Sequence, residues 1–165
     1  SVSATTRPQR AGERDGADYH FVSPAAFARL RTRRALLEWA GVHGAVYGTL
    51  SSSVRPVLAR GQDVVLSVDV QGARQLKRAF GARAVLIFLM PPSFDALKTR
   101  LIRRRTDSPS AIRRRLAAAK RELRCARAYD YVVINHRIPE AVDDLKAIVT
   151  AERLRVARGR HRRIS

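Results

Sequence analysis

The chain has 165 residues, of which 45% are hydrophobic, so it is long enough for one domain with a substantial core. Its longest apolar run, residues 84–90, is far shorter than the about 20 residues that a membrane-spanning helix needs. The single cysteine, Cys125, excludes a disulfide within the chain and favours a reducing, cytoplasmic location.

Positive charge is the extreme feature of the composition. The chain has 33 Lys and Arg against 14 Asp and Glu, a net charge of +19. Two explanations of this excess are open. One is an anionic partner, either a nucleotide or a nucleic acid, and the other is a GC-rich genome, whose codons favour Arg and Ala. Arginines that bind a ligand therefore have to be identified by position and not by number.

The first 60 residues predict short strands and helices that form a small mixed sheet. Ser23 followed by Pro24 is a typical helix start, and Gly44 is suited to a hairpin turn. In chain order, the predicted elements are a strand at 19–22, a helix from 24 to about 31, strands at 36–42 and 45–50, and a helix at 51–60.

Beyond residue 60, strand and helix signals alternate, which predicts an α/β fold with a parallel sheet covered by helices. Ser93 is predicted to cap a helix, and residues 106–110 form a polar break. In chain order, the predicted elements are a buried strand at 63–69, a helix at 71–80, a buried strand at 82–90, helices at 94–103 and 111–127, a buried strand at 129–135 and a helix at 139–157.

Residues 1–22 hold the first group with chemical meaning. Arg7 and Arg10 are three residues apart beside hydroxyl side chains, and guanidinium forks bind phosphate through paired hydrogen bonds. The pattern TTRxxRxGExxGxDYxFV resembles the guanylate kinase family closely. The resemblance continues in order through EWAxxHGxxYGT (38–49), VDVQGAR (68–74), PPS (91–93), RLxxAxxE (115–122), YDYVVIN (129–135) and AERLR (151–155).

The resemblance implies the P-loop nucleoside monophosphate kinase fold, in which helices flank a parallel sheet. The single domain would comprise an inserted mixed-β GMP-binding subdomain (1–60), a core (61–100 and 116–165) and a helical lid (101–115). The implied reaction is transfer of the ATP γ-phosphate to GMP, giving ADP and GDP, in purine nucleotide metabolism. GMP and ATP with its Mg²⁺ are the expected partners; no protein-ligated metal, membrane or specific nucleic acid is expected, and the sequence leaves the oligomeric state open.

The resemblance also assigns roles in GMP binding. Glu38 and Thr49 match the residues that read guanine: a carboxylate accepts from N1–H and the N2 amino group, and a hydroxyl donates to O6. Adenine lacks that pair of donors, so a buried Glu38 would discriminate against AMP. Asp69 matches an aspartate near the guanine amino group and the phosphates. The groups that match the GMP phosphate ligands are Ser3, Arg7, Arg10, Tyr19 and Tyr47.

Three arginines match those at the borders of the family's lid, which close over the ATP phosphates: Arg100, Arg104 and Arg115. Such cations position and neutralise the transferred group. Asn135 matches a residue near the adenine. The chain departs from the family at Ser67, where a second acid is usual, and near Arg103 and Arg105, where glycine is usual, which predicts a stiffer lid hinge.

The sequence holds no GxxxxGK[ST] loop, which in the family cradles the ATP phosphates and precedes the first arginines. The resemblance therefore predicts that this loop and a strand in the middle of the sheet lie upstream of Ser1. Residues 1–165 alone are then expected to bind GMP weakly, to transfer no phosphate, and to be unstable because apolar strands lack a neighbour.

Three alternatives to the enzyme remain. A non-catalytic guanylate-kinase-like module would bind GMP or a protein, but the retained arginines, tyrosines and Glu38 favour the enzyme. A related kinase of ribose bisphosphate is disfavoured by Glu38 and Thr49, which suit guanine. A nucleic-acid binder follows from charge alone, and strong salt-dependent DNA binding without a GMP preference would favour it.

Overall fold

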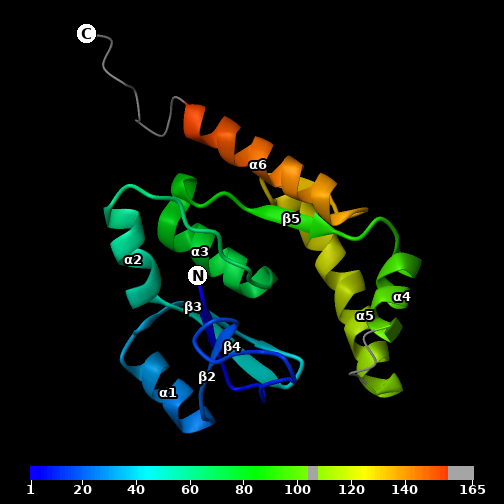
Figure 1. Ribbon diagram of the computed structural model, residues 1–165, viewed down its shortest axis with the longest axis horizontal. Helices are drawn as coiled ribbons and strands as arrows, with labels where there is room; N and C mark the ends of the chain where they lie inside the picture. The colour runs from blue at the N-terminus through cyan, green and yellow to red at the C-terminus, as the bar shows by residue number, and fades with distance from the viewer. Residues whose placement is uncertain (104–107, 156–165) are drawn as a thin grey trace. The chain divides into compact units, whose positions relative to one another are not determined.

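The computed structural model describes residues 1–103 and 108–155. The chain divides into two compact units, Ser1–Ala84 and Val85–Ser165 (Figure 1). The finer division into subdomain, core and lid stays a prediction. No helix in the described part of the chain is long and apolar enough to cross a membrane.

The first unit is built on a four-stranded mixed sheet, as predicted. Strand β1 lies between β2, to which it is parallel, and β4, to which it is antiparallel; β3 pairs antiparallel with β4 at the edge. The strands are β1 (Ser3–Thr5), β2 (Tyr19–Phe21), β3 (Leu36–Val42) and β4 (Ala45–Leu50).

A tight turn fixes the register of β3 against β4. His43 and Gly44 both have positive φ angles, 52° and 87°. Two consecutive residues of this kind form the hairpin turn whose twist matches that of paired strands. The turn therefore aligns Val42 with Ala45, and the ladder runs from there to Leu36 with one irregularity before Glu38.

Helix α1 (Pro24–Thr32) covers one face of this sheet. Ser23 caps it, since its Oγ accepts from the backbone N–H of Ala26 at 3.1 Å. Phe27 is 1% exposed and packs against Gly48 of β4, where even a Cβ atom would lie 3.2 Å from the Phe27 ring. The small residue thus permits the helix to approach the strand closely. Helices α2 (Ser51–Ala59), α3 (Val70–Phe80) and η1 (Gly81–Arg83) complete the unit.

The prediction of a strand at residues 63–69 is wrong, because no strand forms there. Val65 is 78% exposed, and the carbonyl of this residue accepts a hydrogen bond from the amino group of Ser1 at 3.2 Å. An apolar, β-branched run becomes a strand only when a neighbouring strand pairs with it. Within the described residues, none does.

The second unit contains a parallel pair of strands, β5 (Ile87–Met90) and β6 (Tyr131–Ile134), in register from Ile87 opposite Tyr131 to Met90 opposite Ile134. The parallel sheet is therefore confirmed for these two strands, which are shorter than predicted. Its helices are α4 (Phe94–Arg103), α5 (Pro109–Leu123), η2 (Arg124–Ala128) and α6 (Ile138–Leu154). Leu89, Val132 and Ile134 remain 46–52% exposed, so the strands keep uncovered apolar surface.

Candidate functional site

One row of side chains crosses all four strands of the first unit. Tyr19 of β2 lies opposite Ser3 of β1, Ser3 lies opposite Thr49 of β4, and Thr49 lies opposite Glu38 of β3. Residues directly opposite one another in a sheet share a face. Tyr47, two residues before Thr49 on the same strand, also shares it. The sheet thus brings together five of the predicted GMP-binding residues.

Glu38 and Thr49 form the buried end of this row. Glu38 is 5% exposed and Thr49 is fully buried, and the Thr49 hydroxyl donates to Glu38 Oε1 at 2.7 Å. Burial raises the pKa of Glu38, the negative charge of Asp69 raises it further, and the Thr49 hydrogen bond opposes both effects. The pair therefore presents a buried acceptor whose ionised form needs hydrogen-bond donors.

Asp69 lies close enough to Glu38 to influence its charge, although its direct contacts are structural. It caps α3: its Oδ1 accepts from the backbone N–H of Gly72 at 2.8 Å, and its Oδ2 accepts from Gln71 Nε2 at 3.2 Å. Helix α3 also anchors the edge strand, because the Gln75 amide exchanges hydrogen bonds with the backbone of Trp39. The cap therefore fixes Asp69 beside the Glu38 end of the row.

The other end of the row is aromatic and cationic. The guanidinium of Arg7 lies 5.4 Å from the Tyr19 ring centre and 5.5 Å from that of Phe21. The Tyr19 and Tyr47 rings meet edge to face, 6.0 Å apart. Because a cation is attracted to aromatic faces, these rings hold Arg7 beside the two tyrosines.

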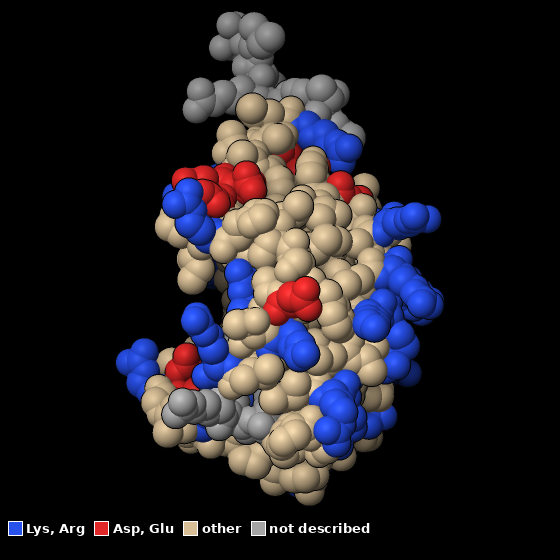
Figure 2. All heavy atoms as spheres, turned by 90° about the vertical axis from the view of Figure 1, so that its right-hand side faces the viewer, with Lys and Arg blue, Asp and Glu red and all other residues tan. Residues whose placement is uncertain are grey.

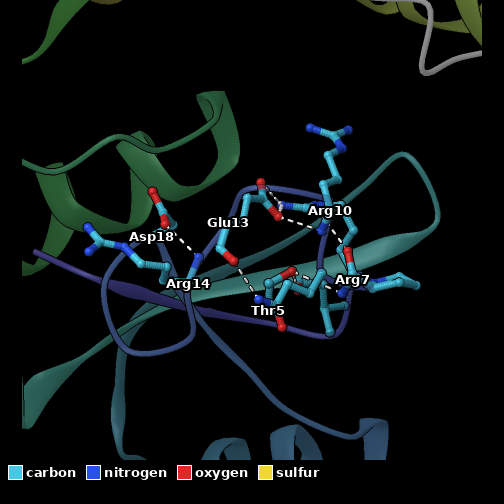
Figure 3. Close-up of polar contacts among 9 residues, drawn as sticks. Thr5, Arg7, Arg10, Glu13, Arg14 and Asp18 are labelled. Atoms are coloured by element: carbon cyan, nitrogen blue, oxygen red, sulfur yellow. Dashed lines mark hydrogen bonds and ion pairs between the residues drawn. The ribbon is translucent and has the colours of Figure 1, made fainter.

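Glu13 binds Arg7, a contact that sequence reasoning did not assign. Arg7 Nη2 donates to both Glu13 carboxylate oxygens, at 2.7 and 3.0 Å, and the backbone N–H of Arg10 donates to Oε2 at 2.8 Å (Figure 3). The hydrogen bond from Arg7 and then that from the Arg10 backbone lower the pKa of Glu13, and the same Arg7–Glu13 hydrogen bond raises the pKa of Arg7. The position of Glu13 in the TTRxxRxGE motif is the sequence feature that could have indicated this contact.

Arg10 differs from Arg7. Its backbone belongs to the Glu13 cluster, but its side chain is exposed and its guanidinium points away from Glu13 (Figure 3). The loop that follows is closed by its own carboxylates, since Asp18 accepts from the Arg14 N–H at 2.7 Å and Asp15 accepts from the Phe21 N–H at 2.8 Å. The loop thus holds Arg7 in place and leaves the Arg10 guanidinium at the surface.

Gly72 is a second residue whose role sequence reasoning missed. A Cβ atom at this position would overlap Glu38 Oε2 and approach the Glu38 carboxyl carbon to 3.1 Å. Only glycine therefore leaves room for the Glu38 carboxylate where it lies. The glycine in the VDVQGAR motif is the sequence feature that could have indicated this role of Gly72.

Gly72→Ala is therefore expected to weaken GMP binding about tenfold or more with little loss of stability. The overlap is with the end of a flexible side chain, so the Glu38 carboxylate moves while the helix, in which Ala is favoured over Gly, is kept. Titration with GMP and a thermal melt test this. The control is Gly41→Ala, a position with open space around a Cβ. Unchanged GMP affinity in Gly72→Ala would contradict the role.

In the second unit, the structure brings Arg100 and Asn135 together. Arg100 Nη2 donates to the backbone carbonyls of Asn135 at 2.8 Å and of His136 at 3.3 Å, just after β6 ends. Arg115 lies on α5. Arg104 lies outside the described residues. No group of three His, Cys, Asp or Glu that could hold a metal ion occurs in the described part of the chain.

A four-stranded mixed sheet followed by a unit of parallel strands and helices matches the fold of the nucleoside monophosphate kinases, as the superposition on a solved guanylate kinase shows. The sequence model of guanylate kinases matches residues 1–152. The chain is 50% identical over 155 residues to the guanylate kinase of Methylobacillus flagellatus, covering 94% of this chain and 76% of that protein.

A guanylate kinase of Thermus thermophilus is 51% identical over 158 residues, covering 96% of this chain and 71% of that protein. The crystal structure of guanylate kinase from Anaplasma phagocytophilum superposes with a TM-score of 0.82 at 35% identity, covering 94% of this chain and 76% of that one. The chain belongs to the guanylate kinase family. Guanylate kinases are phosphate-transferring enzymes whose substrates are GMP and ATP.

Proposed function

We propose that the sheet face of the first unit binds GMP and that the bound GMP accepts the γ-phosphate of ATP, giving GDP and ADP. The observation that supports this most directly is the row Tyr19, Ser3, Thr49 and Glu38, whose buried end suits a base and whose cationic end suits a phosphate.

At the buried end, an exchange of hydrogen bonds explains the selection of guanine. Without GMP, the Thr49 hydroxyl donates its one hydrogen to Glu38. When guanine binds, its N1–H and N2 amino group donate to Glu38, and the Thr49 hydrogen turns to O6. Each buried polar group keeps a partner in both states. AMP lacks the two donors, so the Glu38 carboxylate would keep only the Thr49 hydrogen bond and its other acceptor sites would face no donor on the base.

At the other end, the GMP phosphate would be bound by Arg7 and Arg10 together with the hydroxyls of Ser3, Tyr19 and Tyr47. Within the described residues, no group hydrogen-bonds the hydroxyl of Ser3 or of Tyr19, so both can donate to a phosphate oxygen. Arg7 is already placed by Glu13 and the aromatic rings, which limits the entropy lost on binding.

On the ATP side, Arg100, Arg104 and Arg115 would neutralise the transferred phosphate, and Asn135 would lie near the adenine. Mg²⁺ would bind chiefly through the ATP phosphates and water, as is usual for this ion. Positioning and charge neutralisation account for most of the catalysis of phosphoryl transfer. A cytoplasmic location fits substrates of this kind and the lone Cys125.

Titration with GMP, IMP and AMP tests the proposal. IMP keeps N1–H and O6 but lacks the 2-amino group, so the expected order of affinity is GMP, then IMP, then AMP, with up to about 10⁴-fold between the first and last. Guanosine serves as the control without phosphate. Equal affinity for GMP and AMP would overturn the assignment of Glu38 and Thr49.

A further inference from the structure

The solvent-facing side of α5 and η2 carries a row of cations that the proposed reaction does not use. Six of its members are arginine or lysine, and Ala117 is the one uncharged residue among them. From residue 113 to residue 127, the exposed side chains are Arg113, Arg114, Ala117, Lys120, Arg121, Arg124 and Arg127.

The five arginines of this row, Arg113, Arg114, Arg121, Arg124 and Arg127, form what is here termed the arginine stripe. At about 100° per residue along α5 and about 120° per residue along η2, they fall within an arc of about 100°. Arg115 and the acid of this helix, Glu122, project to the opposite side. The stripe is therefore separate from the arginine proposed to act on ATP.

No Asp or Glu among the described residues forms an ion pair with any arginine of the stripe. Figure 2, which looks at the side of α4 and α5, shows Lys and Arg side chains spread over the surface and fewer Asp and Glu side chains. Like charges three or four residues apart, such as Arg121, Arg124 and Arg127, destabilise a helix. The stripe thus carries a repulsion that a polyanion would relieve.

We propose that the arginine stripe binds the phosphate backbone of double-stranded DNA without sequence preference. Guanidinium groups bind phosphate oxygens through paired hydrogen bonds. From Arg113 to Arg127 the stripe is about 23 Å long, at about 1.5 Å per residue along α5 and about 2.0 Å per residue along η2, which matches roughly seven base pairs at about 3.4 Å each.

Three features of the surface select this partner. The stripe contains no aromatic side chain, whereas single-strand binding relies on stacking of bases on aromatic rings. The apolar side of α5, with Ile112, Leu116 and Leu123, is partly buried within the protein, whereas a membrane-surface helix inserts that side into lipid. An α-helix fits the wide major groove of B-form DNA but not the narrow one of duplex RNA.

The test is fluorescence anisotropy of a labelled, mixed-sequence 20-base-pair DNA duplex over a range of salt concentrations, after which GMP and ATP are added to the formed complex. The stripe variant replaces Arg113, Arg121, Arg124 and Arg127 with Gln, which has a similar helix propensity. The control removes equal charge from exposed arginines of the first unit, as Arg29→Gln, Arg33→Gln, Arg55→Gln and Arg78→Gln. Thermal melts establish that both variants remain folded.

We expect the stripe variant to bind DNA at least about tenfold more weakly and its salt slope to fall by about three to four, since each phosphate contact contributes about 0.9. The control variant is expected to bind much as the parent does. Equal losses in both variants would show that net charge alone is responsible and would overturn the proposal. Displacement of DNA by GMP and ATP, or equal or tighter binding to duplex RNA or to phosphatidylserine vesicles, would also overturn it.

Discussion

Replacing Glu38 with Gln is expected to weaken GMP binding by about 100- to 1,000-fold while raising the melting temperature at pH 7. The carbonyl oxygen of the glutamine amide can accept one hydrogen bond from guanine. Its NH₂ group, however, takes the place of the second carboxylate oxygen, so it faces a guanine N–H donor where an acceptor is needed. Loss of one charge-assisted hydrogen bond together with this mismatch costs about 3–4 kcal/mol. AMP binding is expected to change little, because AMP does not use the carboxylate.

The gain in stability follows from the raised pKa of Glu38. Its pKa is raised above the ordinary value of 4.5 chiefly by burial, so the folded protein favours the neutral acid. The stability that this acid contributes is fully present below about pH 4.5 and is lost as the pH rises through the folded-state pKa. Glutamine is neutral at every pH, so the variant avoids that loss. The melting temperature of Glu38→Gln should therefore be clearly higher than that of the parent protein at pH 7, and the two should be equal near pH 4.

Glu140→Gln is the matched control, since Glu140 is an exposed acid on α6 that pairs with Arg137. Titrations with GMP and AMP and thermal melts at both pH values complete the experiment. Retained GMP affinity in Glu38→Gln would remove Glu38 from the guanine site. A lower melting temperature at pH 7 would show that the ionised carboxylate is stabilised by partners other than Thr49.

Much of the candidate site follows from sequence because strand alternation decides it. Once Thr49 and Tyr47 are placed on one strand, they must share a face, and the predicted hairpin around Gly44 brings Glu38 opposite Thr49. Helix starts were equally predictable: Ser23 and Ser93 both accept hydrogen bonds from the first turn of the helix that follows, as expected of cap residues.

The parts that sequence could not supply depend on packing across distance. The room that Gly72 leaves for Glu38 depends on how α3 lies against β3, and the Arg7 contact with Glu13 depends on how a loop closes. For residues 63–69, in contrast, the sequence predicted an element that does not form. Their apolar, β-branched run is typical of a buried strand. A strand forms only beside a neighbouring strand, and local composition does not reveal whether one is present.

Replacing Arg7 with Gln is expected to weaken GMP binding by about 100-fold and to leave guanosine binding unchanged. A paired guanidinium–phosphate contact contributes about 1.5–3 kcal/mol per charge-assisted hydrogen bond, and only GMP has the phosphate. Equilibrium titration with both ligands measures the difference. An equal loss for guanosine would mean that Arg7 supports the sheet face as a whole and not the phosphate.

The role of Glu13 is tested by combining the two substitutions. If Glu13 positions Arg7, Glu13→Gln is expected to weaken GMP binding about tenfold, because one of the oxygens that Arg7 contacts becomes an NH₂ group. Arg7→Gln should then reduce GMP affinity by a smaller factor in the Glu13→Gln background than in the parent protein. Tighter GMP binding in Glu13→Gln would show instead that the carboxylate competes with the phosphate for Arg7. Because Glu13 has a lowered pKa, it is ionised throughout the neutral range, so its effect on GMP binding should be constant from pH 6 to 8 and fade only as the pH falls below about 4.5.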